Sequence, residues 1–251
     1  MRFEDVAAAV AGVPYMSPAQ GRMIFDHLCA QRPSAVLELG TARGVGAAYM
    51  AAALEANDHG ELESVESSGV RFEDPGPEDV LARAGLSHRV RLDRSFSTYT
   101  WFLKEKIQER ADSSANCEPC YDFVYLDGAK NWTVDGCAIF LIEKLLRPGG
   151  WLLMDDLGWS YGAAGKAVAD GVRVAEMSPR ERAEPHLQAV FDLLVTQHPS
   201  FTELRVQDGK WGWARKAPGE PRKLSIETTR SLSALALAGV HRVQRRRRTR
   251  P

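Results

Sequence analysis

The sequence AVLELGTARGVG, residues 35–46, joins a short apolar run to a glycine-rich turn. An apolar run without polar alternation, such as residues 35–39, is typical of a strand that is buried on both faces of a sheet. After Gly44-Val45-Gly46, a run rich in alanine and methionine continues to Ala56, and we expect it to be a helix. This strand, turn and helix make one complete βα unit, which is the building block of a parallel sheet.

The same alternation continues along the chain. We expect further helices at 18–32, 77–84, 98–110 and 134–146, and further strands at 61–66, 89–92, 123–126 and 151–154. Two more strands, 201–207 and 210–215, flank Asp208-Gly209, which is a hairpin turn signal. The sequence therefore predicts an α/β, Rossmann-like, seven-stranded sheet that is mostly parallel, with an antiparallel C-terminal hairpin strand and helices on both faces.

Composition and charge predict one domain followed by a tail. The chain has 251 residues, of which 44% are hydrophobic and 26% charged, enough for a sizeable core over residues 1–216 with a helical insert at about 157–200. From Arg215 onward the sequence has eleven Lys or Arg against two Glu, so the preceding 214 residues carry a net charge of −10. An acidic body argues against a nucleic-acid partner. The tail, 217–251, is expected to be partly helical or disordered and solvated, with an acidic partner as the alternative.

Neither a targeting segment nor a cysteine framework is evident. No apolar run approaches the ~20 residues of a membrane helix, and the N-terminus lacks the features of a signal peptide, so we expect no membrane span and a cytoplasmic protein. Cys117 and Cys120 form a single C-x-x-C without a second pair. This spacing is a weak zinc or redox signal, and we interpret it as a pair of loop cysteines.

Acidic side chains follow two of the expected strands. Asp127 lies in YLDGAK, residues 125–130, and Asp155 and Asp156 end LLMDD, residues 152–156. Because ligands gather outside the carboxyl ends of parallel strands, we expect these acids to converge although 28 positions separate Asp127 from Asp155. The pattern predicts a metal site, with Lys130 beside it.

The glycine turn predicts the charge of a second ligand. Its spacing from Gly40 is G-x-x-x-G-x-G, which differs from the G-x-G-x-x-G of dinucleotide enzymes. Glu38, two residues before Gly40, argues against a phosphate and suits a cation such as the amino end of S-adenosylmethionine. Glu66 ends the second strand, where an acid commonly accepts hydrogen bonds from ribose hydroxyls. The alternative is an ordinary βα turn with surface acids.

With these motifs the chain resembles the class I S-adenosylmethionine-dependent methyltransferases, and within them the metal-dependent catechol and caffeoyl-CoA O-methyltransferase group. The resemblance rests on VLELGTARGVG (36–46), SVESS (64–68), YLDGAK (125–130) and LLMDD (152–156), and it covers about residues 16–156. It implies S-adenosylmethionine as cofactor. The cofactor-binding residues that it implies are Met16, Ser17, Glu38, Gly40, Thr41, Gly44, Glu66, Ser97 and Asp127.

The resemblance also implies a divalent metal, usually Mg²⁺, held by Asp127, Asp155 and Asp156. Hard oxygen ligands suit Mg²⁺, which would hold a substrate hydroxyl and lower its pKa. Lys130 falls where the group keeps its general base, so Asp127 and Lys130 are the predicted catalytic residues. Among cations, a partly desolvated lysine can have a depressed pKa. The chain departs from the pattern of the group at Asp156, where the relatives have an amide.

The acceptor is expected to be a small molecule. Two oxygens on one metal suit a vicinal diol of a phenol or a sugar, including a natural-product intermediate, and an amine is the alternative. Trp159, Tyr161, His186 and His198 lie in the insert expected to cover the acceptor, and the two histidines are more simply interpreted as packing residues. The sequence leaves open a metal-independent N- or O-methyltransferase, an RNA methyltransferase using the basic tail, a cofactor-binding protein without activity, and a homodimer.

Overall fold

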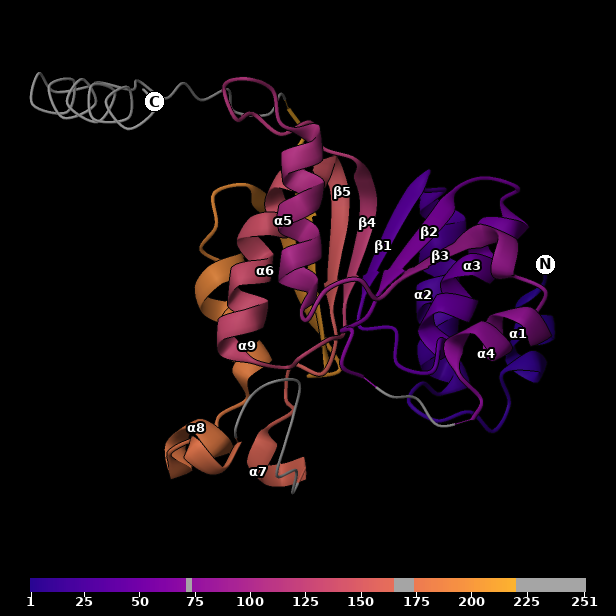
Figure 1. Ribbon diagram of the computed structural model, residues 1–251, viewed down its shortest axis with the longest axis horizontal. Coiled ribbons are helices and arrows are strands. Elements are labelled where there is room, and N and C mark those ends of the chain that lie inside the picture. Colours follow the sequence, from indigo (N-terminus) through magenta and orange to yellow (C-terminus); the bar gives the residue numbers. More distant parts are fainter. Residues whose placement is uncertain (71–73, 165–173, 220–251) are drawn as a thin grey trace, which may run out of the picture.

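A computed structural model describes residues 1–70, 74–164 and 174–219 (Figure 1). The strands are β1 (Ala35–Leu39), β2 (Glu61–Val65), β3 (Val90–Asp93), β4 (Tyr121–Leu126), β5 (Leu146–Met154), β6 (Phe201–Gln207) and β7 (Trp211–Lys216). The helices are α1 (Phe3–Ala9), α2 (Pro18–Gln31), α3 (Val45–Ala56), α4 (Pro77–Arg83), α5 (Tyr99–Arg110), α6 (Trp132–Leu145), α7 (Tyr161–Ala164), α8 (Pro179–Ala183) and α9 (His186–Val190), with short helical turns η1 (Ser87–Arg89), η2 (Val174–Glu176) and η3 (Phe191–Val195). The predicted tail lies outside the described residues from 220 onward.

All seven strands belong to one sheet, in the order β3-β2-β1-β4-β5-β7-β6. Strands β1 to β5 are parallel to their neighbours, whereas β7 pairs antiparallel with both β5 and β6. The predicted fold class is confirmed. The strand order changes direction between β1 and β4, and in open α/β sheets this switch point is where ligands bind, outside the carboxyl ends of the strands.

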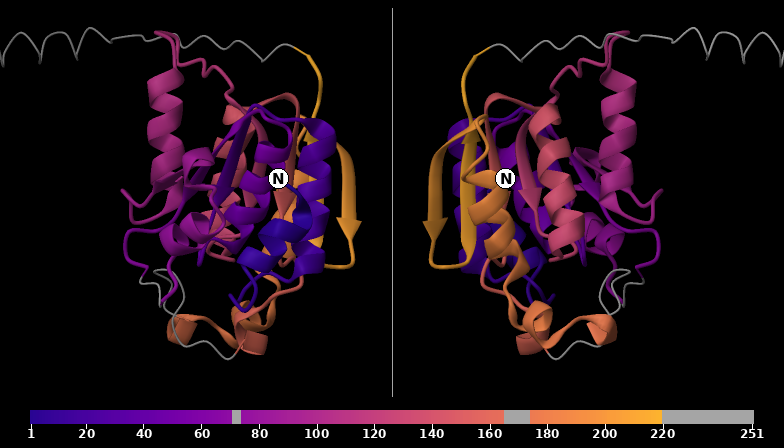
Figure 2. Two further views of the ribbon diagram at one scale, coloured as in Figure 1. Left: turned by 90° about the vertical axis from the view of Figure 1, so that its right-hand side faces the viewer. Right: turned by 90° about the vertical axis from the view of Figure 1, so that its left-hand side faces the viewer.

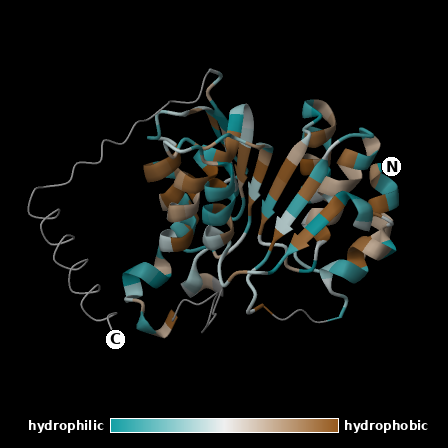
Figure 3. Ribbon diagram, turned by 45° about the horizontal axis from the view of Figure 1, so that its top comes forward, coloured by the Kyte–Doolittle hydropathy of each residue, from teal (hydrophilic) through white to brown (hydrophobic). Residues whose placement is uncertain are grey.

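A hydrophobic core covers each face of the sheet (Figures 1 and 2). Val36, Phe123 and Tyr125 face α1, α2, α3 and α4, whereas Leu37 and Val124 face α5, α6 and the segment from α9 to η3. Successive strand residues point to opposite faces, so the apolar runs of β1 and β4 supply both cores. The strands are largely hydrophobic in Figure 3.

Most predicted elements are present, with changes at their ends. β5 begins at Leu146, which pairs with Tyr121 before a bulge, so the segment 147–150, which lies between the predicted helix 134–146 and the predicted strand 151–154, is part of the strand. The predicted insert contains α7, α8, α9 and η3, and residues 165–173 within it lie outside the described part. Among the described helices, none has the length and apolarity needed to cross a membrane.

Gly40 brings the end of β1 against the loop that follows β4. Its φ is +102°, and a Cβ atom there would lie 2.4 Å from the carbonyl oxygen of Asp127. On the same strands, Asp127 N donates to Leu39 O at 2.9 Å and Gly40 N donates to Val65 O at 2.9 Å. The glycine turn and the first acidic loop therefore share one backbone contact.

We expect Gly40→Ala to destabilise the fold more than a glycine substitution that only strains the backbone. Gly85 is the matched control, because its φ is +69° and a Cβ atom there would meet nothing within 4 Å. Left-handed strain costs about 1–2 kcal/mol, and overpacking adds roughly 1–3 kcal/mol. Urea unfolding of the two variants measures the difference. Equal losses of unfolding free energy would contradict the close approach at Gly40.

Candidate functional site

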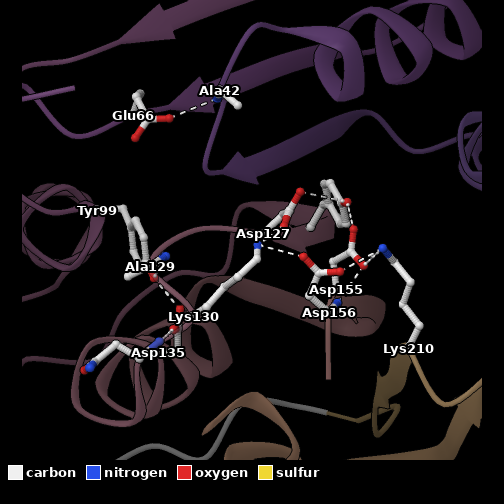
Figure 4. A network of polar contacts seen from close by, with 12 residues as sticks. Ala42, Glu66, Tyr99, Asp127, Ala129, Lys130, Asp135, Asp155, Asp156 and Lys210 are labelled. Carbon is white, nitrogen blue, oxygen red and sulfur yellow. Dashed lines mark hydrogen bonds and ion pairs between the residues drawn. The ribbon is translucent and has the colours of Figure 1, made fainter. Parts of the chain in front are cut away.

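The three predicted carboxylates come together at the ends of β4 and β5 (Figure 4). The two strands pair in parallel with Leu126 opposite Met154, and Asp155 N donates to Leu126 O at 3.0 Å. The residues that follow, Asp127 on one strand and Asp155 and Asp156 on the other, therefore leave the sheet side by side. Their convergence, expected from the sequence, is present in the structure.

Two lysine side chains bridge these carboxylates. Lys130 Nζ lies 2.6 Å from Asp127 Oδ1 and 3.1 Å from Asp156 Oδ2. Lys210 Nζ lies 2.7 Å from Asp156 Oδ1 and 3.3 Å from Asp155 Oδ1. The sequence indicated Lys130 but not Lys210, which enters from the turn between β6 and β7. Lys130 and Asp156 also have φ of +54° and +57°, an uncommon conformation for residues other than glycine that is typical of functional sites.

Tyr125 supplies a third donor from beneath the cluster. Its hydroxyl lies 2.7 Å from Asp155 Oδ2 and 3.2 Å from Asp127 Oδ2. Burial, reinforced by these carboxylates, raises the pKa of Tyr125 well above its usual value, so the side chain remains a phenol that donates. Tyr125 precedes Asp127 by two residues on the same strand, and this spacing, which puts both on one face, was the available sequence signal.

The charges of the cluster follow from burial and these contacts. Burial, together with the charges of Asp127 and Asp156, raises the pKa of Asp155 to about 7. Burial alone would also raise the pKa of Asp156, but Lys130 and Lys210 outweigh it and hold that pKa below its usual value. Burial lowers the pKa of Lys130, whereas its two carboxylate partners raise it more strongly. The expected depression of the Lys130 pKa is therefore wrong for this arrangement, in which Lys130 is a charged ammonium group.

The three carboxylates are the predicted ligands of a divalent metal ion. Three carboxylates are the hard oxygen ligands that such an ion prefers, but each of their oxygens already faces a donor from the protein: Lys130, Lys210 or Tyr125. Asp155 Oδ1 also accepts from Asp156 N at 2.6 Å. In this arrangement the three carboxylates do not fit a resident divalent ion. Within the described chain, no group of three or more His, Cys, Asp or Glu is placed to hold a metal.

Acidic side chains also stand at the ends of β1 and β2. Glu38 is 1% exposed and accepts a hydrogen bond from Ser64 Oγ, which lies 2.7 Å from Thr41 Oγ1. Burial raises the pKa of Glu38 well above its usual value. Glu66 Oε2 accepts from Ala42 N at 2.9 Å, so the glycine turn orients this carboxylate. The ends of β1, β2 and β4 thus present acids toward one region, which suits a cationic ligand.

The remaining cofactor candidates lie around the same turn. Met16 Cε and Glu38 Oε1 both border the space above Gly46, within 3.4 Å of where a Cβ atom would lie. Gly44, at φ +79°, begins α3. Ser17 is committed to capping α2, where its Oγ accepts from Gln20 N. Ser97 accepts from Ser67 Oγ at 2.8 Å, so the loops after β2 and β3 are joined by a hydrogen bond. Their roles toward a cofactor stay predictions.

The loop that carries Lys130 is held by a buried pair that the sequence did not indicate. Asp135 is fully buried, accepts from the Tyr99 hydroxyl, and accepts from Asn131 N at 2.6 Å. Tyr99 in turn accepts from Ala129 N at 3.1 Å. Burial raises the pKa of Asp135 to about 6. The pair fixes the backbone on both sides of Lys130.

A cavity of about 490 Å³ lies between α6 and the α8–α9 region. Its lining includes Asn131 and Trp132, which directly follow Lys130, and it includes His186. His186 is buried, its Nδ1 accepts from Trp132 N at 3.2 Å, and its Nε2 lies 2.8 Å from Glu181 O. Both ring nitrogens of His186 therefore contact the backbone, which agrees with its interpretation as a packing residue. His198 lies elsewhere, against Phe140 and Phe201.

Two further insert residues pack beside the acidic loop. Trp159 and Tyr161 make an edge contact at 4.7 Å, and Tyr161 also packs against His186 at 5.2 Å. The Tyr161 hydroxyl donates to Ala129 O at 3.1 Å. The insert is thereby tied to the loop that carries Lys130.

The buried Asp135 predicts a pH dependence of stability. Its pKa is raised on folding, so the folded state binds more protons than the unfolded state between about pH 4 and pH 6. The corresponding stability is fully present below about pH 4 and is lost as the pH rises to about 6, by at most 2–3 kcal/mol. We expect Asp135→Asn to be less stable at every pH, because one acceptor is lost, but to lack this slope. Urea unfolding at pH 4, 5 and 6.5 tests it; parallel curves for both proteins would contradict the prediction.

Comparison with known proteins agrees with this geometry. Residues 37–157 match the family model of a methyltransferase domain, whereas no curated protein matches the sequence. Among solved structures, an O-methyltransferase from Bacillus cereus in complex with S-adenosylhomocysteine is 19% identical, with a TM-score of 0.57 over 85% of this chain and 90% of that chain. The O-methyltransferase TomG from Streptomyces achromogenes, in complex with S-adenosylmethionine, is 19% identical, with a TM-score of 0.55 over 86% and 89%. The methyltransferase PaMTH1 from Podospora anserina, bound to S-adenosylhomocysteine, is 17% identical, with a TM-score of 0.57 over 85% and 86%.

The solved structures share the fold of this chain, and the family model covers the segment from β1 to the residue after Asp156. That segment contains the glycine turn, Glu38, Glu66 and the acids after β4 and β5. The chain thus contains a methyltransferase domain, within the Rossmann-like fold of the class I S-adenosylmethionine-dependent methyltransferases.

Proposed function

We propose that the protein transfers the methyl group of S-adenosylmethionine to a hydroxyl oxygen of a small molecule. The observation that carries this proposal is the juxtaposition, at one end of the sheet, of the acids that follow β1, β2 and β4 with Lys130, whose next two residues, Asn131 and Trp132, line a cavity. The fold neighbours from Bacillus cereus and Streptomyces achromogenes are O-methyltransferases, which favours oxygen as the acceptor atom. Methyl transfer is an in-line displacement, so alignment of the three reacting atoms supplies most of its acceleration.

The acids at the ends of β1 and β2 are proposed to bind the cofactor. Glu66 is held by the amides of Ala42 and Ser67, and a carboxylate has further acceptor sites that suit two ribose hydroxyls. Glu38 and Asp127 are proposed to face the amino group and the sulfonium, and a bound cation would favour the charged form of Glu38 against the burial that raises its pKa. Met16, Gly40, Thr41 and Gly44 are proposed to form the walls of this site, with Ser17 and Ser97 at its rim. Because glycine has no side chain, the cofactor could lie close to the main chain at Gly40 and Gly44.

The acceptor is proposed to bind in the 490 Å³ cavity beside Lys130. Glu176, Glu181 and Glu184 are among its lining residues, and no Lys or Arg of the described chain lines it. This charge favours a neutral or cationic acceptor over an anionic one. Trp132, which is 40% exposed, offers a flat face to a ring. A phenol or a sugar with vicinal hydroxyls fits these features, as does an aromatic amine.

Lys130 is proposed to act on the acceptor hydroxyl. In the structure its ammonium group is charged and donates, so it can stabilise negative charge that develops on the acceptor oxygen. The general-base role implied by the resemblance adds one condition: the contacts with Asp127 and Asp156 must loosen before the amine can accept a proton. The divalent metal implied by the resemblance does not fit the carboxylates as Lys130, Lys210 and Tyr125 hold them. Methyl transfer in EDTA decides it.

The direct test is turnover by the full chain. Formation of S-adenosylhomocysteine is measured with catechols, vicinal sugar diols and aromatic amines, and mass spectrometry with NMR locates the new methyl group. We expect turnover on a hydroxyl compound. Methylation of nitrogen alone would replace the proposal with its N-methyltransferase alternative, and no turnover across the panel would count against small-molecule methylation.

We expect Lys130→Met to lower kcat by about 10²-fold or more, because a positioned acid or base typically contributes ~10²–10⁴-fold. The dissociation constant of S-adenosylmethionine should stay within about twofold of the wild-type value, since Lys130 faces the acceptor side. Lys104→Met is the matched control, because Lys104 is a half-exposed lysine whose ion-pair partner is Glu105 on α5. Unchanged kcat in Lys130→Met would remove Lys130 from the catalytic residues.

For the cofactor, we expect Glu66→Ala to weaken S-adenosylmethionine binding by about tenfold or more, since hydrogen bonds to a charged group are worth roughly 1.5–3 kcal/mol. Glu61, exposed at the start of the same strand, provides the control variant Glu61→Ala. Isothermal titration calorimetry measures both. Equal affinities in the two variants would show that Glu66 does not contact the cofactor.

A further inference from the structure

We propose that Lys210 takes the place of a divalent cation, so that the site works with two lysine ammonium groups and binds neither Mg²⁺ nor Mn²⁺ as a cofactor. The inference rests on the proposed function for the identity of the site. It concerns cation binding, however, and is testable without methyl transfer. Lys210 thereby becomes a residue that positions the carboxylate cluster.

The sheet register delivers Lys210 to this place. β5 and β7 pair antiparallel with Met154 opposite Gly212, Leu153 opposite Trp213 and Leu152 opposite Ala214. Continued by two residues beyond the strand ends, this register sets Asp156 opposite Lys210. The distance of 2.7 Å between Lys210 Nζ and Asp156 Oδ1 agrees with it. The lysine is therefore a product of strand pairing and not of a flexible side chain that happens to reach the cluster.

The backbone of Lys210 is fixed from both sides. Asp208 and Gly209 turn the chain with φ of +54° and +62°, and Lys210 N donates to Gln207 O at 3.0 Å. On the other side, Leu157 N donates to Lys210 O at 2.9 Å, which joins the hairpin turn to the loop of Asp156. The Cα atom of Lys210 is thereby held where its side chain reaches Asp155 and Asp156.

The second lysine also explains why residue 156 is an acid. Asp156 gives one oxygen to Lys130 and the other to Lys210. An asparagine would turn its NH₂ group, which only donates, toward one of two ammonium groups that also only donate. Asp156 and Lys210 are therefore a matched pair, in contrast to the amide of the metal-dependent relatives.

Two ammonium groups together carry the charge of one divalent ion, and they contact all three carboxylates. Lys130 bridges Asp127 to Asp156, and Lys210 bridges Asp156 to Asp155. A metal ion binding to the same oxygens would have to displace both contacts of Lys210, one with Asp156, which is 26% exposed, and one with Asp155, which is 6% exposed. The lysines thus compete directly with the metal.

The test measures Mn²⁺ binding to the full 251-residue chain by electron paramagnetic resonance, without acceptor. The double variant Lys210→Met/Asp156→Asn restores the carboxylate, carboxylate and amide set of the metal-dependent relatives. We expect it to bind one Mn²⁺ at least about tenfold tighter than the wild type, a change of the size that neighbours of metal ligands commonly cause. Lys210→Arg, which keeps the cation, should not gain this affinity, and neither should Lys104→Met.

Circular dichroism and thermal unfolding establish that each variant is folded, and Lys210→Arg keeps the test valid if the double variant is not. Wild-type protein that binds one Mn²⁺ as tightly as the double variant would overturn the proposal, as would a folded double variant without gain or a gain in Lys210→Arg. In a second arm, wild-type turnover should change less than twofold in EDTA. Loss of turnover in EDTA with recovery in Mg²⁺ would also overturn it. Absence of turnover on every acceptor would count against the proposed function and leave the Mn²⁺ result standing.

Discussion

The structure of this site depends on the neutralisation of three carboxylates gathered at the ends of two adjacent strands. Carboxylates that are partly buried side by side raise one another's pKa, and an unpaired buried charge is costly. Asp127, Asp155 and Asp156 are compensated by Lys130, which follows β4, and by Lys210, which precedes β7. The C-terminal hairpin is thus a structural part of the site. Pairing of β7 with β5 completes the sheet and also delivers the second cation.

The fold and half of this arrangement could be predicted from local sequence. The glycine turn, Glu38, Glu66 and the three aspartates each follow an apolar strand, so their position at the carboxyl edge required only the order of elements. Lys210 required the register of an antiparallel pair, which an Asp-Gly turn indicates only approximately. In the sequence Tyr125 is one residue of an apolar strand, and the contact of its hydroxyl with Asp155 follows only from the position of the neighbouring strand. The spacing of Tyr125 and Asp127 signals only that they share a face, and the contact with Asp155 on the neighbouring strand depends on the pairing of β4 with β5.

The protonation of Lys130 shows a second limit. Burial and an adjacent carboxylate act on a lysine pKa in opposite directions, so residue types in sequence cannot give the sign. Distances of 2.6 and 3.1 Å to two carboxylates decide it in favour of the ammonium form. The same applies to Asp135, whose burial beneath the Lys130 loop was invisible in a helical segment that reads as amphipathic. The error at Lys130 concerns which charges meet, whereas the position of Lys130 after the fourth strand was predicted correctly; Asp135 carried no prediction.

Replacement of a metal ion by an ammonium group changes which acceptors the site can activate. Lys130 can still donate a hydrogen bond to an acceptor oxygen, so a phenol or a diol stays within the proposed acceptors. However, a divalent ion lowers the pKa of a bound hydroxyl by direct coordination, whereas an ammonium group acts only through a hydrogen bond and its charge. A phenol, with a pKa of about 10, needs much less activation than an alcohol whose pKa lies near that of water, about 16. A site built on Lys130 and Lys210 therefore favours the phenolic acceptor over the sugar, and the flat face of Trp132 in the neighbouring cavity favours the same choice.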